Sequence, residues 1–232
     1  MAIPDPSTIP KRVRKIQACI RAAESRHRRA PGFVTLLAVS KGQGAEAIRA
    51  AVGAGLTRFG ESYLQEALAK RARLAGLDAE WHFIGPIQSN KTREIAAGFD
   101  WVHGVDRAKV ARRLNDQRAG VLPPLQVCVQ VNLSGEAGKS GVAPGDLEDL
   151  AALVRTLPRL RLRGLMGIPA RTAGLAAQRR ALRPLREAFD ALNRAGFALD
   201  TLSMGMTGDL EAAVAEGATL VRIGTGVFGP RG

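Results

Sequence analysis

The chain has 232 residues, enough to bury the core of one large domain, and a formal net charge of +13. Its two cysteines, Cys19 and Cys128, exclude a disulfide-rich fold, and no group of Cys or His residues has the spacing of zinc ligands. The basic residues are spread over every segment without interleaved aromatic residues, so we expect no nucleic-acid partner despite the positive charge.

The first predicted element is a helix within residues 1–30. Ile9, Val13, Ile16 and Ile20 stand four, three and four residues apart, which places one apolar stripe on a helix whose other face is mostly basic. The segment lacks the apolar core of a signal peptide, and no run of 18 apolar residues occurs in the chain. We therefore expect a cytoplasmic protein without a membrane partner.

Eight strand-like runs follow, separated by segments with helical periodicity such as Leu147, Leu150, Val154 and Leu157. The predicted strands are residues 33–40, 57–60, 80–85, 101–105, 125–133, 160–168, 199–204 and 219–228. No linker or charge block divides the chain, so we predict one domain over residues 1–232 of the α/β class, a single (β/α)8 TIM barrel with an extra N-terminal helix. A doubly wound open sheet shows the same alternation, but the first strand ends in SKGQG and lacks the G-x-G-x-x-G fingerprint of a dinucleotide site.

Several residues mark the ends of the predicted helices. Glycine readily adopts the left-handed conformation that closes a helix, and glycines stand where four helices should stop. These glycines are Gly55, Gly76, Gly196 and Gly217. Pro184 falls within a helical repeat, so we expect it to kink that helix or to delay its start.

Lys41 follows the first predicted strand, whose sequence VTLLAVS is mostly apolar. Only 7 of the 34 basic residues are lysine, so a lysine at this place suggests chemistry that arginine cannot perform. Alternation puts Lys41 on the face of Val39 and Leu37, at the carboxyl-terminal mouth where barrel enzymes gather functional residues. Partial burial of an ammonium generally lowers its pKa and favours the neutral amine that forms a Schiff base. A lysine that reaches solvent or pairs with a carboxylate is the structural alternative.

The loops after the seventh and eighth predicted strands contain small residues, in LSMGMTGD and LVRIGTGVFG. Many TIM barrels bind a phosphate group with these two loops. Gly205 and Gly224 permit close approach of the backbone. Ser203 and Thr225 add hydroxyl donors, and a helix predicted to begin near Asp209 directs its positive end at the site. A glycine of this kind taken alone is more often part of a tight turn, but the combination indicates a phosphate site.

Arg222 lies in the eighth predicted strand, and either Arg222 or its apolar neighbours Val221 and Ile223 must point into the barrel. A buried guanidinium needs an acceptor, and a salt bridge in the core is the ordinary solution. A pyridine nitrogen that stays unprotonated against Arg222 is a more specific solution. The amine at a strand end, the phosphate loops and this arginine together match pyridoxal 5′-phosphate (PLP), which carries an aldehyde, a phosphate and a ring nitrogen.

Two other sequence patterns do not point to a functional site. GEAGKS, residues 135–140, resembles the end of a P-loop, but two residues rather than four separate its glycines. We therefore expect no ATP site and place Glu136 and Lys139 in a loop at the barrel mouth. His82 and His103 lie in the third and fourth predicted strands, and we expect them to pack in the core or at the rim rather than to act as acid or base.

Seven motifs resemble those of the pyridoxal phosphate homeostasis proteins (the YggS/PROSC family), which are similar to the barrel domain of alanine racemase without its second domain. The motifs, in chain order, are LLAVSK, RFGESYLQEALAK, WHFIGPIQSNK, VNLSGEAGKSG, RGLMGIP, LSMGMTGDLEAAV and VRIGTGVFG. The resemblance covers nearly the whole chain. It implies that Lys41 is the Schiff-base lysine and that Arg222 faces the pyridine nitrogen. It also implies that Ser203, Gly224 and Thr225 hold the phosphate.

Members of this family are regarded as PLP carriers or regulators of vitamin B6 and of amino/keto acid pools, without established catalytic turnover. We therefore expect a protein that holds PLP reversibly on Lys41 and passes it transiently to apo-enzymes, and we expect it to be a monomer. Ser62 stands where the family usually has an asparagine near the cofactor. An amino-acid racemase of low activity is the alternative function. Racemisation needs a base on each face of the substrate, and Tyr63 is the one tyrosine that could resemble the second base of alanine racemase.

Overall fold

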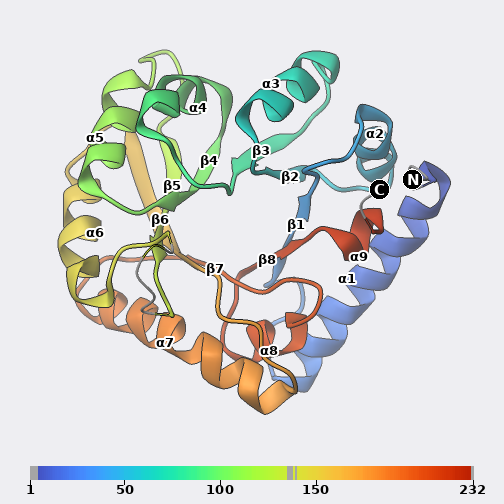
Figure 1. Ribbon diagram of the computed structural model, residues 1–232. Coiled ribbons are helices and arrows are strands. Elements are labelled where there is room, and N and C mark those ends of the chain that lie inside the picture. Colours follow the sequence, from blue (N-terminus) through green and yellow to red (C-terminus); the bar gives the residue numbers. More distant parts are fainter. Residues whose placement is uncertain (1–4, 135–137, 139, 231–232) are drawn as a thin grey trace.

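A computed structural model of the protein describes residues 5–134, 138 and 140–230 (Figure 1). Within these residues, eight parallel strands form a closed barrel in which each strand pairs with the next and β8 pairs with β1. The strands are β1 Thr35–Val39, β2 Arg58–Glu61, β3 Glu80–Phe83, β4 Trp101–Val105, β5 Leu125–Val131, β6 Leu160–Gly167, β7 Thr201–Ser203 and β8 Leu220–Ile223. The predicted (β/α)8 barrel is confirmed, and a doubly wound open sheet is excluded. Glu136 and Lys139 lie outside the described residues.

Helices surround the barrel on its outer face (Figure 1). Those in the described part of the chain are α1 Ile9–Arg26, α2 Ala45–Gly53, α3 Leu64–Arg73, α4 Thr92–Gly98, α5 Ala108–Gln117, α6 Leu147–Arg155, α7 Leu175–Arg194, α8 Leu210–Ala215 and α9 Thr225–Phe228, with short 3-10 turns at Pro6–Thr8, Ser89–Lys91 and Pro144–Asp146. The four glycines predicted to end helices all have positive φ angles, between 82° and 96°. The helix α7 begins nine residues before Pro184 and continues past it, so the proline does not delay its start.

The predicted eighth strand is too long. The strand β8 ends at Ile223, and the segment Thr225–Phe228 forms the short helix α9. Gly224 leaves the extended conformation at φ −99° and ψ −76°, and the N–H of Phe228 donates to the Gly224 carbonyl over 2.9 Å. Val227 and Phe228 resemble strand residues in sequence, but they are buried by one helical turn beside α1.

The predicted N-terminal helix is confirmed as α1, which lies against α2, α8 and α9 (Figure 1). The four residues of its predicted apolar stripe are buried. The helix α9, which follows β8, is only four residues long, and α1 covers the barrel beside it. Near its end, the Glu24 carboxylate accepts hydrogen bonds from the backbone N–H groups of Gly32 (3.0 Å) and Val34 (2.7 Å), which fix the chain just before β1.

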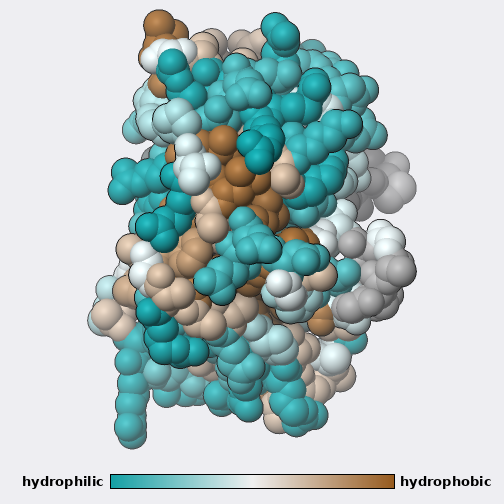
Figure 2. Space-filling model, turned by 90° about the vertical axis from the view of Figure 1, so that its left-hand side faces the viewer, coloured by the Kyte–Doolittle hydropathy of each residue, from teal (hydrophilic) through white to brown (hydrophobic). Residues whose placement is uncertain are grey.

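The hydrophobic core lies mainly between the strands and the helices. A separate small group, Trp101, Cys128 and Met166, is buried apart from this main core. Figure 2 shows the flank that carries α5 and α6, where apolar residues form a central band bordered by hydrophilic ones. Among the described helices none is long and apolar enough to cross a membrane. The described Cys, His, Asp and Glu residues likewise form no group that could hold a metal ion.

Candidate functional site

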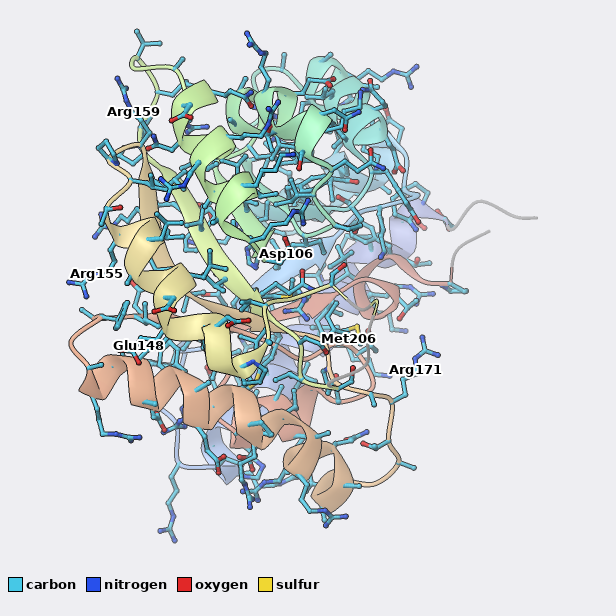
Figure 3. All side chains as sticks on the ribbon, turned by 60° about the vertical axis from the view of Figure 1, so that its left-hand side comes forward. Asp106, Glu148, Arg155, Arg159, Arg171 and Met206 are labelled. Carbon is cyan, nitrogen blue, oxygen red and sulfur yellow. The ribbon has the colours of Figure 1, made fainter. Side chains whose placement is uncertain are left out.

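A cavity of about 480 Å³ opens at the carboxyl ends of the barrel strands. Its lining includes four of the predicted site residues, Lys41, Arg222, Gly224 and Thr225. Figure 3 labels two residues of its rim, Met206 in the loop after β7 and Arg171 in the loop after β6. A larger hollow of about 880 Å³ runs along α1, but neither Lys41 nor Arg222 lines it. The cavity at the barrel mouth is therefore the candidate functional site.

Lys41 stands two residues beyond the end of β1 and lines this cavity together with Val39. Its side chain is partly exposed. The strand delivers it there because Leu37 and Val39, on the same face of β1, point toward the barrel interior and its mouth. The structure thus brings the amine to the place that the strand pattern predicts.

Arg222 points into the barrel, which settles the choice between it and its apolar neighbours. It pairs in register with Leu37 of β1 and is 5% exposed. Its Nη1 donates to the carbonyl oxygen (2.6 Å) and the hydroxyl oxygen (2.8 Å) of Ser203, and its Nη2 donates to the Gly167 carbonyl (2.9 Å). Within the described residues, neutral oxygens rather than a carboxylate hold this guanidinium. Burial lowers the pKa of Arg222 to about 10, which leaves it charged at neutral pH.

A chain of hydrogen bonds runs through the barrel interior from Arg222. Beyond the Arg222–Ser203 contact, Ser203 Oγ lies 2.9 Å from His103 Nδ1. His103 Nε2 lies 2.9 Å from His82 Nδ1, and His82 Nε2 lies 2.8 Å from Glu80 Oε1. We call this series of five residues, from Glu80 to Arg222, the interior chain.

The two ends of the interior chain determine the direction of its hydrogen bonds. The Glu80 carboxylate only accepts, so a neutral His82 donates through Nε2 and accepts at Nδ1 from His103. His103 then accepts at Nδ1 from the Ser203 hydroxyl, which accepts in turn from Arg222. Burial lowers the pKa of both histidines, so both are neutral at pH 7. The hydrogen bond from His82 lowers the pKa of Glu80 to about 2, so Glu80 is ionised.

The loops after β7 and β8 meet at one side of the cavity. The hydroxyl oxygens of Thr207 and Thr225 are 3.2 Å apart, and the backbone N–H of Gly226 donates to Thr207 Oγ1 over 3.3 Å. The Gln178 side chain of α7 supports this wall by donating to the Gly208 carbonyl over 3.0 Å. Two hydroxyls and the backbone at the start of α9 therefore converge where a phosphate group is predicted.

Two predicted site residues, Ser203 and Gly205, do not line the cavity. Ser203 is fully buried and belongs to the interior chain. Gly205 has a φ of +94°, and a Cβ atom there would lie 2.4 Å from the Cβ of Ala213 in α8. The structure therefore gives Ser203 a contact with Arg222 and gives Gly205 a close contact with a helix. The phosphate roles predicted for these two residues stay predictions.

Some lining residues were not identified from the sequence. Thr207 could have been predicted from the sequence. It lies in the motif LSMGMTGD, in the loop that follows the seventh predicted strand. Gln178 carried no such signal, because its contact with the Gly208 carbonyl joins residues 30 positions apart. Ser62, noted for its departure from the family pattern, does line the cavity.

Comparisons with known proteins agree with this geometry. The family model described as "Alanine racemase, N-terminal domain" matches residues 13–232. The "Pyridoxal phosphate homeostasis protein" of Pseudomonas aeruginosa is 60% identical over 225 residues, which is 97% of this chain and 96% of the relative. The protein of the same name from Escherichia coli K12 is 51% identical and aligns over 91% of this chain and 92% of its own length. The solved structure of PipY from Synechococcus elongatus PCC7942 with PLP bound is 37% identical, with a TM-score of 0.79 over 90% of this chain and 100% of that one.

Proposed function

The chain belongs to the family of pyridoxal phosphate homeostasis proteins, and from this premise we propose that it binds PLP in the mouth cavity and takes part in the intracellular homeostasis of PLP and of amino/keto acid pools. The observation that carries this proposal is the convergence of Lys41, Arg222 and the two hydroxyl-bearing loops on one cavity. Named relatives at 51% and 60% identity over nearly their full length support it.

The residues of the cavity fit PLP by their chemistry. The volume of about 480 Å³ lies within the range typical of small-molecule sites. Thr207, Thr225 and the N–H groups at the start of α9 are donors suited to a phosphate. Arg222 supplies a donor that keeps an opposing pyridine nitrogen unprotonated. When bound, PLP supplies an aldehyde that condenses reversibly with a primary amine.

We assign the Schiff-base role to Lys41, which is the lysine that lines this cavity among the described residues. Lys41 follows the end of β1 by two residues, so the barrel brings its amine to the cavity. A reversible bond at this place suits a protein that holds the cofactor and releases it to other proteins. We propose that the recipients are apo-enzymes met transiently, and that the protein is a cytoplasmic monomer without a nucleic-acid partner.

An amino-acid racemase of low activity is the second candidate. Racemisation requires a base on each face of the substrate carbon. Tyr63 does not line the cavity, and its side chain is exposed at the start of α3. Arg222 at the ring nitrogen also disfavours racemisation, because an unprotonated pyridine accepts negative charge poorly. These two observations favour the carrier over the racemase.

The first prediction concerns the absorption of the purified protein with PLP added. We expect an imine band that borohydride removes, and we expect the band to be lost in Lys41→Ala because the condensing amine is gone. Lys109→Ala, which changes an exposed lysine of α5, is the matched control and should keep the band.

Two results would contradict the proposal. A band that persists unchanged in Lys41→Ala would mean that another lysine carries the aldehyde. Exchange of the α-deuterium of alanine with solvent at on the order of ten per second, a typical enzyme rate, would favour the racemase over the carrier.

A further inference from the structure

We propose that Glu61, Glu66 and Lys70 are positioning residues that fix the backbone on both sides of Lys41 and so determine where its amine enters the cavity. This inference rests on the proposed role of Lys41 toward PLP. The three residues come from the end of β2 and from α3, and none of them lines the cavity. We call them the clamp.

The clamp binds Ser40, the residue before Lys41. The Lys70 ammonium donates to the Ser40 carbonyl over 2.6 Å and to Glu61 Oε1 over 2.8 Å. The Ser40 hydroxyl donates to the same Glu61 oxygen over 2.6 Å. Both the backbone and the side chain of Ser40 are therefore held.

The clamp also binds Gly42, the residue after Lys41. The backbone N–H of Gly42 donates to Glu66 Oε1 over 2.6 Å. Glu66 forms an ion pair with Lys70 one helical turn away, so the two halves of the clamp are joined. Gly42 has a φ of +74°, in the left-handed region. Because glycine can adopt several backbone conformations, the bond to Glu66 selects this one. The peptide groups on either side of Lys41 are thus bonded to one network.

The burial of the clamp indicates that it acts as a rigid unit. Two of its three residues are buried, Glu61 at 0% and Lys70 at 7% exposure, as is Ser40 at 0%, while the Glu66 side chain is 31% exposed. Burial raises the pKa of Glu61, and the charge of Lys70 is the largest effect that opposes this rise. An ion pair that served only to attach α3 to the barrel would not need to bond the backbone of both neighbours of Lys41.

The clamp also separates the two lysines by function. An ammonium has three N–H donors, and those of Lys70 meet three acceptors, on Ser40, Glu61 and Glu66. Lys70 is therefore directed into this network, and it does not line the cavity, whereas Lys41 does. Lys41, presented into the cavity by the same network, is then the amine that reacts.

The experiment compares Glu66→Ala with Glu66→Gln, since glutamine keeps an oxygen that accepts from Gly42 and alanine does not. Because a displacement of about 1 Å at a reacting group can lower its effectiveness up to about a hundredfold, we expect Glu66→Ala to raise the dissociation constant for PLP at least about tenfold. Glu66→Gln should stay within about twofold of the unmodified protein, since the hydrogen bond to Gly42 is retained. Glu46→Ala removes an exposed carboxylate of α2 and serves as the control.

A second measurement does not depend on PLP. In the protein without PLP, amide hydrogen exchange at Gly42 should be at least about tenfold faster in Glu66→Ala than in Glu66→Gln, because the N–H has lost its acceptor. Circular dichroism shows whether each variant folds. Should Glu66→Ala not fold, Glu66→Ser makes the same test, because serine is too short to reach Gly42.

The outcomes separate the clamp from the proposed function. Failure of the unmodified protein to form an imine that depends on Lys41 overturns the proposed function. Normal imine formation with equal PLP affinity in Glu66→Ala and Glu66→Gln overturns the clamp. Weaker binding in Glu66→Ala with unchanged exchange at Gly42 also overturns it, since the effect would not pass through the backbone.

Discussion

A single hydroxyl group, that of Ser203, joins the charged arginine of the cavity to the histidines of the barrel interior. It accepts from Arg222 Nη1 and lies within hydrogen-bond distance of His103 Nδ1. Because His103 is fully buried, its Nδ1 could not turn to water if the hydroxyl were removed. At the scale of the residue, Ser203 therefore holds Arg222 and satisfies His103 Nδ1.

We predict that Ser203→Ala lowers the free energy of unfolding of the protein without PLP by about 1–3 kcal/mol, since it leaves His103 Nδ1 without a donor. Chemical denaturation measures this change. Ser25→Ala, at an exposed position of α1, is the control and should have an effect within about 0.5 kcal/mol. If the hydroxyl instead contacted the phosphate, the stability without PLP would be unchanged and only the affinity for PLP would fall.

The strands of the barrel approach one another closely at one glycine. Gly164 of β6 pairs with Thr201 of β7, and a Cβ atom at Gly164 would lie 1.6 Å from the Thr201 carbonyl oxygen. The register of β5 against β6 also shifts next to this residue, between Val127 and Cys128. At the scale of the element, β6 can join its neighbours only because residue 164 has no side chain.

We predict that Gly164→Ala abolishes folding or lowers the free energy of unfolding by more than about 4 kcal/mol, because the backbone of β7 cannot move aside without opening the barrel. Thermal unfolding followed by circular dichroism tests this. Gly53→Ala at the end of α2 is the matched control, since a Cβ atom there meets nothing within 4 Å. A folded Gly164→Ala variant with the melting temperature of the unmodified protein would contradict the close approach.

The whole molecule buries two neutral histidines in the middle of its barrel. His82 is 1% exposed and His103 is 0% exposed, and burial is the main cause of the lowered pKa of each. In the unfolded chain both would titrate near their ordinary pKa of about 6.5. Below that pH the unfolded state therefore binds more protons than the folded state, and protonation favours unfolding.

We predict that the free energy of unfolding falls by about 1–3 kcal/mol between pH 8 and pH 5.5, because folding lowers the pKa of both histidines, that of His103 most clearly. Denaturant titrations at the two pH values measure it. The depressed pKa of Glu80 acts at lower pH, since its contribution to stability is present above its unfolded pKa and is lost as the pH falls through about 2. A free energy that stayed constant down to pH 5.5 would show that the histidines are protonated in the folded state.

The sequence alone determined the barrel and the position of Lys41 at its mouth. Strand alternation and helical periodicity are local properties of the chain, so the eight strands and the burial of the α1 stripe could be predicted from short windows. The placement of Lys41 on the same side as Leu37 of β1 followed from the same alternation. The error at residues 225–228 has a local cause too, since Val227 and Phe228 are common in strands and only packing beside α1 makes them helical. That residues 1–232 are one domain stays a prediction.

Only the tertiary structure decided which side chains meet. His103 and Ser203 are 100 positions apart, and their hydrogen bond exists because barrel closure brings β4 and β7 to face each other across the interior. The contact of Lys70 with the Ser40 carbonyl likewise depends on how α3 is placed against the barrel, because it joins residues 30 positions apart. Such contacts depend on tenths of an ångström in three dimensions, while periodicity in a sequence records only which face of an element a residue occupies.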